Sequence, residues 1–168
     1  MDEKTLVQRA VTGDKEAFAG LYTRYKDGLY RYAFFKLGND ADAQDALSDC
    51  IVAAYRSIGS LKNAATFSAW IFRILYRCCC SYVKDQIEQN SRADISVLER
   101  VPTEDEKLLS VEIREALDQL DPADRDIILL SAVAGYNSRE ISAVTGIKAT
   151  TVRSRLSRGL KKMRTFLE

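Results

Sequence analysis

The sequence predicts an all-α protein made of two small helical bundles joined by an extended linker. Apolar residues recur three or four positions apart through most of the chain, which is the spacing of one helix face. Only two prolines and eight glycines occur among the 168 residues, too few for a loop-rich β sandwich. The helical spacing fails over residues 86–107, so the expected domains are residues 1–85 and 108–168.

The first expected domain contains four helices, each with one apolar face. A short helix ends near Gly13, and a longer one is closed by Gly38 as a C-terminal stop. Thr66 is the expected N-cap of the fourth helix. The third helix is expected from about Asp42 to Ile58, and its predicted inward residues are Ala46, Cys50, Val52, Ala53 and Tyr55.

The second expected domain opens with a helix from Leu108 to Leu120. Asp121 and Pro122 then form a strong helix start, because an acid suits the N-cap and proline suits the first helical position. Asn137, with Glu140 three residues later, has the pattern of a capping box for the following helix.

Charge is distributed unevenly, although the whole chain carries a formal charge of only +1. Residues 1–90 hold twelve basic and eleven acidic residues, whereas residues 91–120 hold four and eight. Residues 121–168 hold nine basic and five acidic residues. A neutral first half, an acidic connection and a basic end are typical of a protein whose end binds nucleic acid.

Missing residue types argue against an enzyme. The chain has no histidine, which is the commonest general base and zinc ligand, and it has no glycine-rich phosphate loop. Cys78, Cys79 and Cys80 are consecutive, so on a helix they point about 100° apart and cannot share one metal ion. We therefore expect no catalytic residue, no cofactor and no metal site. Burial is the favoured interpretation of the thiols, and a redox role is the alternative.

The chain is expected to stay in the cytoplasm. It has no apolar run of 18 residues and begins without the basic and apolar regions of a signal peptide. Four cysteines, three of them adjacent, fit a reducing compartment better than a disulfide framework. No membrane insertion is expected.

The carboxy-terminal end is typical of a helix-turn-helix with a basic second helix. Gly146 supplies the turn, and Ile141, Ile147 and Val152 lie at the apolar positions that lock the two helices together. The predicted buried stripe of the second helix is Val152, Leu156, Leu160, Met163 and Leu167. The opposite face presents Thr151, Arg153, Ser154, Arg155, Ser157, Arg158, Lys161 and Lys162. Arginine can bind guanine through two hydrogen bonds, and lysine or hydroxyl groups suit phosphates, so we expect DNA binding rather than a merely solvated face.

A second candidate site is acidic. Asp42, Asp45 and Asp49 recur three and four residues apart and therefore share one helix face. The helix N-terminus explains the first two acids, but Asp49 lies too far along the helix for that. The face is either a docking surface for a basic protein or a solvated surface, and spacing alone favours the solvated surface.

Several blocks together resemble the extracytoplasmic-function group of bacterial sigma factors, from Gly13 to about Leu167. The matching blocks are Asp42 to Asp49, Trp70 to Ile74 and Thr151 to Leu156. The resemblance implies a sigma-2 domain that docks on the β′ coiled coil of RNA polymerase core and reads the −10 promoter element. It also implies a sigma-4 domain that reads the −35 element and contacts the β flap. Such proteins are non-catalytic promoter-specificity subunits, and an anti-sigma factor is a further implied partner.

The resemblance implies three sets of contact residues. The polymerase-binding set is Asp42, Asp45, Ser48 and Asp49, in which Ser48 replaces the usual glutamine. The −10 set is Lys62, Asn63, Ala64, Arg73 and Arg77, in which Arg77 stands where asparagine is frequent. The −35 set is Thr151, Arg153, Ser154, Ser157, Arg158 and Lys161. Trp70 resembles a core residue rather than a base-stacking one.

A stand-alone helix-turn-helix regulator is the alternative function. Such a regulator usually has a dimerisation helix or an effector pocket in its other half, and it binds a palindrome by itself. A nucleic-acid-processing enzyme is a third hypothesis, and the lack of histidine and of metal-ligand clusters disfavours it.

Overall fold

The structure is a computed structural model that describes the backbone of residues 1–90 and 104–168, and the side chains of residues 1–85 and 111–168. Within these ranges the chain is helical and has no strand, which confirms the all-α prediction. The α-helices are α1 (Glu3–Val11), α2 (Lys15–Leu37), α3 (Asp40–Ser57), α4 (Phe67–Asn90), α5 (Glu104–Asp118), α6 (Pro122–Ala132), α7 (Ser138–Thr145) and α8 (Ala149–Leu167). Two 3-10 helices, η1 (Ile58–Ser60) and η2 (Ala64–Thr66), connect α3 to α4.

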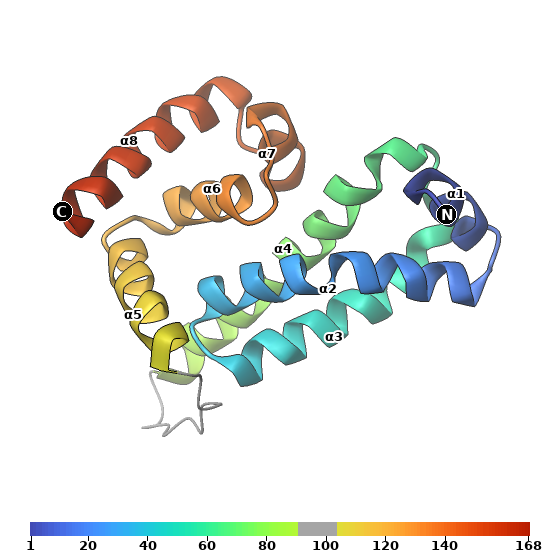
Figure 1. Ribbon diagram of the computed structural model, residues 1–168, viewed down its shortest axis with the longest axis horizontal. Helices are drawn as coiled ribbons and strands as arrows, with labels where there is room; N and C mark the ends of the chain where they lie inside the picture. The colour runs from blue at the N-terminus through green and yellow to red at the C-terminus, as the bar shows by residue number, and fades with distance from the viewer. Residues whose placement is uncertain (91–103) are drawn as a thin grey trace.

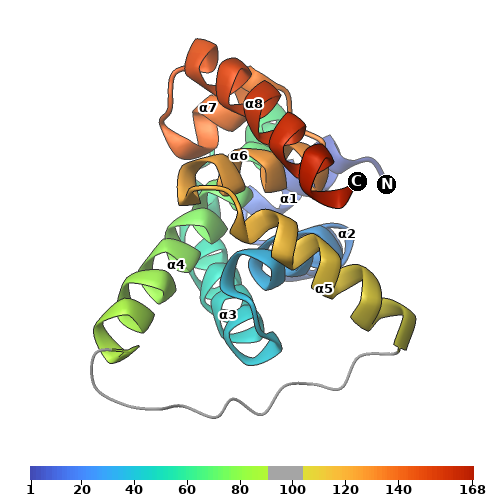
Figure 2. The same cartoon turned by 90° about the vertical axis from the view of Figure 1, so that its left-hand side faces the viewer.

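The helices form two groups that lie against each other. Figure 1 shows α1 to α4 on one side and α6 to α8 on the other, with the two chain ends far apart along the long axis. In both views α8 and α3 lie on opposite sides of the molecule, separated by α2, α4 and α6 (Figures 1 and 2). The helices that carry the predicted acidic and basic residues therefore lie on opposite sides of the molecule.

Local capping sets the helix ends of the first group. The Asp14 carboxylate accepts from the backbone N–H groups of Glu16 and Ala17, at 3.0 and 3.1 Å, and begins α2. Gly38 ends α2 with φ at 85°, a conformation that glycine adopts without strain. The next residue, Asn39, caps α3. Because this cap precedes the expected start, α3 begins two residues earlier than predicted.

Two residues of α3 that were predicted to face inward are exposed instead. Val52 is 50% exposed and Tyr55 is 46% exposed. The buried face consists of Ala43, Ala46, Leu47, Cys50 and Ala54. Its spacing of three and four residues places Val52 about 200° around the helix from Cys50. The prediction was wrong because it counted apolar residues from two different faces as one stripe.

Helix extends into both ends of the predicted linker. α4 continues to Asn90 and α5 begins at Glu104, so residues 86–90 and 104–107 are helical. Glutamine, glutamate and lysine at these positions favour helix without supplying an apolar face, which explains why the apolar spacing stops before the helix does. The remaining linker residues, 91–103, lie outside the described residues.

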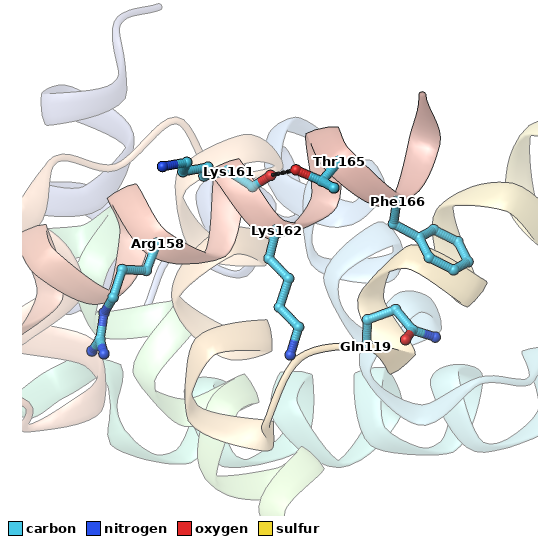
Figure 3. A pocket seen from close by; sticks show the side chains of 6 residues that line it. All are labelled: Gln119, Arg158, Lys161, Lys162, Thr165 and Phe166. Carbon is cyan, nitrogen blue, oxygen red and sulfur yellow. Dashed lines mark hydrogen bonds between the residues drawn. The ribbon is translucent and has the colours of Figure 1, made fainter.

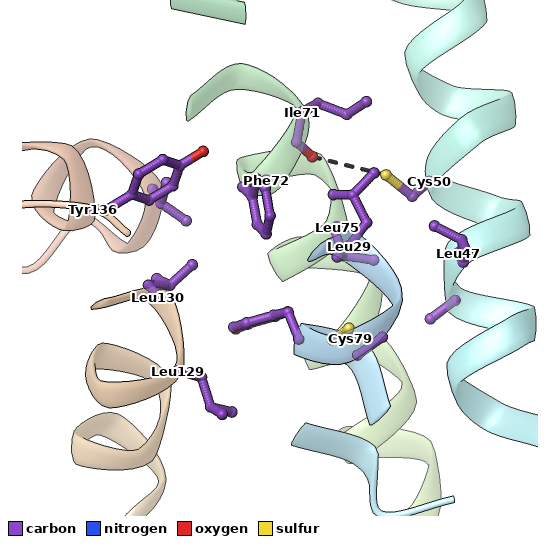
Figure 4. Packing of buried hydrophobic residues seen from close by; sticks show 14 of the residues in the cluster. Leu29, Leu47, Cys50, Ile71, Phe72, Leu75, Cys79, Leu129, Leu130 and Tyr136 are labelled. Carbon is purple, nitrogen blue, oxygen red and sulfur yellow. Dashed lines mark hydrogen bonds between the residues drawn. The ribbon is translucent and has the colours of Figure 1, made fainter. Parts of the chain in front are cut away.

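One continuous apolar core joins the two groups. Tyr136, which follows α6, packs edge-on against Phe72 of α4 with ring centroids 5.4 Å apart (Figure 4). Its hydroxyl lies 2.5 Å from the Ser68 hydroxyl, also on α4. Leu129 and Leu130 of α6 belong to the same buried cluster. The contact between α7 and α4 and that between α6 and α2 thus bury side chains from both halves of the sequence.

A buried ion pair crosses the same interface. Lys36 of α2 pairs with Asp126 of α6, and both side chains are only 8% exposed. The Tyr32 hydroxyl donates to the same carboxylate at 3.4 Å. Burial raises the pKa of Asp126 above its ordinary value, while Lys36 and Tyr32 oppose that shift. Helical spacing did not predict this pair, because its two residues are 90 positions apart in the sequence.

Candidate nucleic-acid interface and docking face

α7 and α8 form a helix-turn-helix. The Asn137 side chain accepts from the Glu140 N–H at 2.9 Å, and the Glu140 carboxylate accepts from the Asn137 N–H at 3.2 Å, which confirms the predicted capping box. Gly146 makes the turn with φ at 80°. The Thr145 hydroxyl donates to the Ile141 carbonyl and accepts from the Ile147 N–H, at 2.9 and 3.2 Å. Thr145 therefore stabilises the turn by hydrogen bonds.

One face of α8 carries the predicted −35 residues. Arg153, Ser154, Ser157, Arg158 and Lys161 are exposed, and Thr151 is half-buried at the start of the helix. Among the described residues, none of the three basic side chains in this set forms an ion pair. The face therefore presents cationic and hydroxyl groups together, the combination that suits phosphates and base edges.

Arg155 does not belong to this face. Its Nη1 lies 3.1 Å from Asp124 Oδ1 and 3.6 Å from Asp121 Oδ1, and both acids begin α6. The sequence placed Arg155 with the DNA-facing residues because it sits at the border between the buried and exposed faces. Arg155 lies three residues after buried Val152 and therefore on a similar side of the helix. This spacing was the available signal that Arg155 makes a contact inside the domain.

The buried stripe of α8 is shorter than predicted. Val152 and Gly159 are buried, whereas Leu160 is 46% exposed and Leu167 is 51% exposed. Leu160 lies about 80° around the helix from Val152, beyond the strip that faces α6. These two leucines were wrongly predicted to be buried.

An open hollow of about 410 Å³ lies beside α8, near the turn between α5 and α6 (Figure 3). Its lining residues are Gln119, Arg158, Lys161, Lys162, Thr165 and Phe166. The Thr165 hydroxyl donates to the Lys161 carbonyl at 3.0 Å, as the dashed line in Figure 3 shows. Three cations and no acid line the hollow, so it extends the basic surface of α8 toward α5.

The exposed face of α3 is acidic. Asp45, Ser48 and Asp49 are exposed, and Asp42 is half-buried beside its cap residue, Asn39. The hydroxyl of Tyr82, on α4, donates to Asp49 at 3.1 Å. Burial, this hydrogen bond and the negative charges of all three aspartates raise the pKa of Tyr82 to about 12. The three carboxylates thus act on one neighbouring group and form one negative surface. The spacing of residues in α3 did not predict this hydrogen bond, because Tyr82 lies on α4.

The predicted −10 residues lie between α3 and α4 and along α4. Lys62 and Asn63 are exposed, and Ala64 is half-buried. The Asn63 side-chain Oδ1 accepts from the Ala65 N–H at 3.0 Å, and the Asn63 backbone carbonyl accepts from the Thr66 hydroxyl at 2.7 Å. Thr66 directly precedes α4, at the position expected for its N-cap, and its hydroxyl stabilises the turn before the helix. Arg73 and Arg77 are exposed one turn apart on α4, so they share a face.

The other residues singled out on α4 pack rather than protrude. Trp70 is half-buried and its ring lies 5.8 Å from that of Phe67. Cys79 is buried, Cys78 and Cys80 are partly buried, and all are free thiols. Burial raises the pKa of Cys79 and, less strongly, that of Cys78, which makes both thiols less reactive.

No helix within the described residues is long and apolar enough to cross a membrane.

Family models for sigma-70 region 2 and sigma-70 region 4 match residues 21–87 and 110–163, respectively. The first range contains α3 and most of α4, and the second contains most of α8. The two matches therefore include both charged faces and the α3–α4 turn.

Curated relatives cover both halves together. The chain is 30% identical over 145 residues to the RNA polymerase sigma factor SigV of Bacillus subtilis, across 86% of this chain and 87% of the relative. It is also 30% identical over 171 residues to the ECF RNA polymerase sigma factor SigE of Mycolicibacterium smegmatis, across 93% of this chain. The chain spans 65% of the length of SigE and 64% of that of BldN from Streptomyces coelicolor, to which it is 26% identical.

Two solved structures share the fold. CnrH, solved in complex with the cytosolic domain of CnrY, is 25% identical with a TM-score of 0.79, covering 98% of this chain and 96% of that one. The sigma factor RpoE of Bartonella quintana, solved with the anti-sigma factor NepR, is 21% identical with a TM-score of 0.77, covering 89% and 96%. On the region matches and the likeness to SigV and to the ECF sigma factor SigE, the chain belongs to the extracytoplasmic-function group of RNA polymerase sigma factors.

Proposed function

We propose that this chain binds RNA polymerase core and directs it to promoters by recognising −10 and −35 elements. The observation that carries the proposal is the placement of two charged faces of opposite sign on opposite sides of one molecule, each within a matched sigma-70 region. The acidic face of α3 suits a basic protein surface such as the β′ coiled coil. The basic face of α8 suits DNA. The chain itself catalyses no reaction in this scheme.

Each function has its own residues. Asp42, Asp45, Ser48 and Asp49 form the core-binding surface on α3. The −10 element is contacted by Lys62, Asn63, Ala64, Arg73 and Arg77, and the −35 element by Thr151, Arg153, Ser154, Ser157, Arg158 and Lys161. Residues 1–85 and 108–168 act as the sigma-2 and sigma-4 domains, joined by residues 86–107, and the second domain also contacts the β flap.

Recognition of both elements at once requires the two halves to separate. The elements are about 25 base pairs apart, which is about 85 Å at roughly 3.4 Å per base pair. A compact chain of this length has a radius of gyration of only about 15 Å. The packed arrangement with α7 against α4 is therefore the arrangement of the free chain, and binding to core pulls the halves apart.

An anti-sigma factor is a further partner, and the chain acts in the cytoplasm with polymerase. The sigma factor RpoE, which has this fold, was solved with the anti-sigma factor NepR, and CnrH, which has it over nearly the whole chain, was solved with the cytosolic domain of CnrY. Both complexes support such a partner. An inhibitor could cover either charged face or hold the two halves together. Each of these modes prevents simultaneous contact with core and promoter.

Transcription with purified core polymerase tests the proposal. Core plus this chain should start specific transcripts on genomic promoters, and the chain alone should bind the same DNA only weakly. A stand-alone regulator would instead protect palindromic sites without core and start no transcript. Mapping transcript starts would reveal both promoter elements at once and identify the regulon.

A further inference from the structure

Arg155 lies on α8, the proposed DNA-reading helix, but its side chain binds acids at the start of α6. Its guanidinium is within 3.1 Å of Asp124 and 3.6 Å of Asp121. Asp121 is the N-cap of α6 and accepts from the Asp124 N–H at 2.9 Å. Arg155 thus binds the carboxylates that define the first turn of α6.

A second contact fixes α8 one turn further along. At Gly159 a Cβ atom would lie 2.7 Å from Ile128 Cδ1, so the backbone of α8 approaches α6 more closely than any other residue type allows without a shift. Val152 is buried on the same side of α8. The helix is therefore held on α6 by an ionic contact near its start and a close backbone contact near its middle.

Together with the packing of α8 on α5, α6 and α7, these two contacts set where the exposed face of α8 points. Ser154 adjoins Arg155 in the sequence, and Arg158 adjoins Gly159. Any rotation or tilt of α8 on α6 would displace such side chains by amounts that matter for a hydrogen bond, whose donor–acceptor distance is confined to about 2.7–3.2 Å. The side chains of Arg155 and Asp124 are only 32% and 18% exposed, so solvent screens their contact less than that of a fully exposed pair.

We infer that Arg155 is a positioning residue for −35 recognition: it acts through Asp124 and Asp121 to orient α8 and does not itself contact DNA. The inference rests on the proposed function, because it assigns the role of one residue within that function. It differs from the family resemblance, which places contacts on the neighbouring residues Arg153, Ser154 and Arg158.

The test is a double-mutant cycle with Arg155→Met and Asp124→Ala. Promoter use is measured by transcription with purified core on templates that share one −10 element and differ in the −35 element. If Arg155 acts through Asp124, each single variant loses about ten-fold on the preferred −35 sequence, comparable to weakening one good base contact, and the double variant loses no more. Arg155→Lys, which keeps the charge, should recover part of the loss.

The salt dependence of promoter binding separates positioning from direct contact. Loss of one phosphate contact lowers the slope of log affinity against log salt by about 0.9. Arg155→Met should leave the slope unchanged, and Arg164→Met, at an exposed site near the end of α8, serves as a matched control for lost charge. A reduced slope for Arg155→Met, or additive losses in the cycle, would overturn the positioning role.

Failure of the inference can be told apart from failure of the proposed function. If the wild-type chain starts no specific transcript with core, the proposed function is wrong, and the −35 role of Arg155 is wrong with it. If the wild-type chain starts transcripts and Arg155→Met retains the same preference among −35 sequences, only the positioning role is wrong.

Discussion

The acidic face of α3 and the ion pair between α2 and α6 differ in how their charges are stabilised. Asp45 and Asp49 are exposed, and neither forms an ion pair with any residue that the structure describes. Lys36 and Asp126 are nearly excluded from solvent and pair with each other. Water solvates the exposed carboxylates of Asp45 and Asp49, and Tyr82 also donates to Asp49, whereas each member of the buried pair depends on its partner.

This difference indicates which charges serve partners and which serve the arrangement of the chain itself. Exposed acids of like sign repel one another and gain from a cationic partner, so changing them should alter binding and spare folding. A buried pair is costly to divide, so changing one member should alter the contact between the two halves.

The largest effect is expected from removing one member of the buried ion pair. Asp126→Ala leaves Lys36 charged and unpaired in the interface, which should destabilise the packed arrangement by about 3–5 kcal/mol. Lys36 regains water if the halves separate, so the variant should open. Small-angle X-ray scattering should detect a larger radius of gyration, and urea unfolding should measure the lost stability.

The double variant Lys36→Met with Asp126→Leu is the matched control. It replaces the pair with apolar side chains and leaves no buried charge, so it should remain packed and unfold at a urea concentration near that of the wild type. An Asp126→Ala chain as compact and as stable as the wild type would contradict the role assigned to the pair.

The next largest effect concerns the acidic face. Asp45→Lys combined with Asp49→Lys reverses charge on the proposed core-binding surface and should weaken core affinity by about 100-fold, because like charges would then face each other. The free energy of unfolding should change little, since both sites are exposed. Asp27→Lys, at an exposed site on α2, is the control. Unchanged core affinity in the double variant would rule out docking through α3.

A smaller effect is expected on the basic face. Arg158→Ala should reduce promoter use by about ten-fold and relax the −35 preference if Arg158 contacts a base, since a good bidentate contact is worth about 1–3 kcal/mol. Transcription on a panel of −35 sequences measures both quantities. A uniform loss on every sequence, with a salt slope smaller by about 0.9, would identify a phosphate contact instead.

Local sequence features predicted the helices and their exposed faces well, because caps and spacing act within a few residues. Gly38, the capping box at Asn137 and the acids of α3 are of this kind. The pair of Lys36 with Asp126 and the packing of Tyr136 on Phe72 could not be predicted, since nothing local links residues so far apart. Val52 and Tyr55 were wrongly assigned inward because apolar residues of two helix faces were counted as one stripe. Arg155 was assigned to the DNA-facing side before its acidic partners at the start of α6 were known.

The smallest expected effect comes from a contact that involves no charge. Gly159→Ala brings a methyl group to 2.7 Å from Ile128 Cδ1, so α8 or the tip of the Ile128 side chain must shift, at a cost of up to about 1 kcal/mol. Adding Ile128→Val removes the Cδ1 atom and should relieve the overlap. Alanine also favours helix over glycine by about 1 kcal/mol, so Gly159→Ala in the Ile128→Val background should be neutral or stabilising relative to Ile128→Val alone. Thermal unfolding of the four chains measures this coupling. Equal effects of Gly159→Ala in both backgrounds would mean that α8 does not rest on Ile128, and the orientation of the DNA-reading face would then depend on Arg155 and Val152 alone.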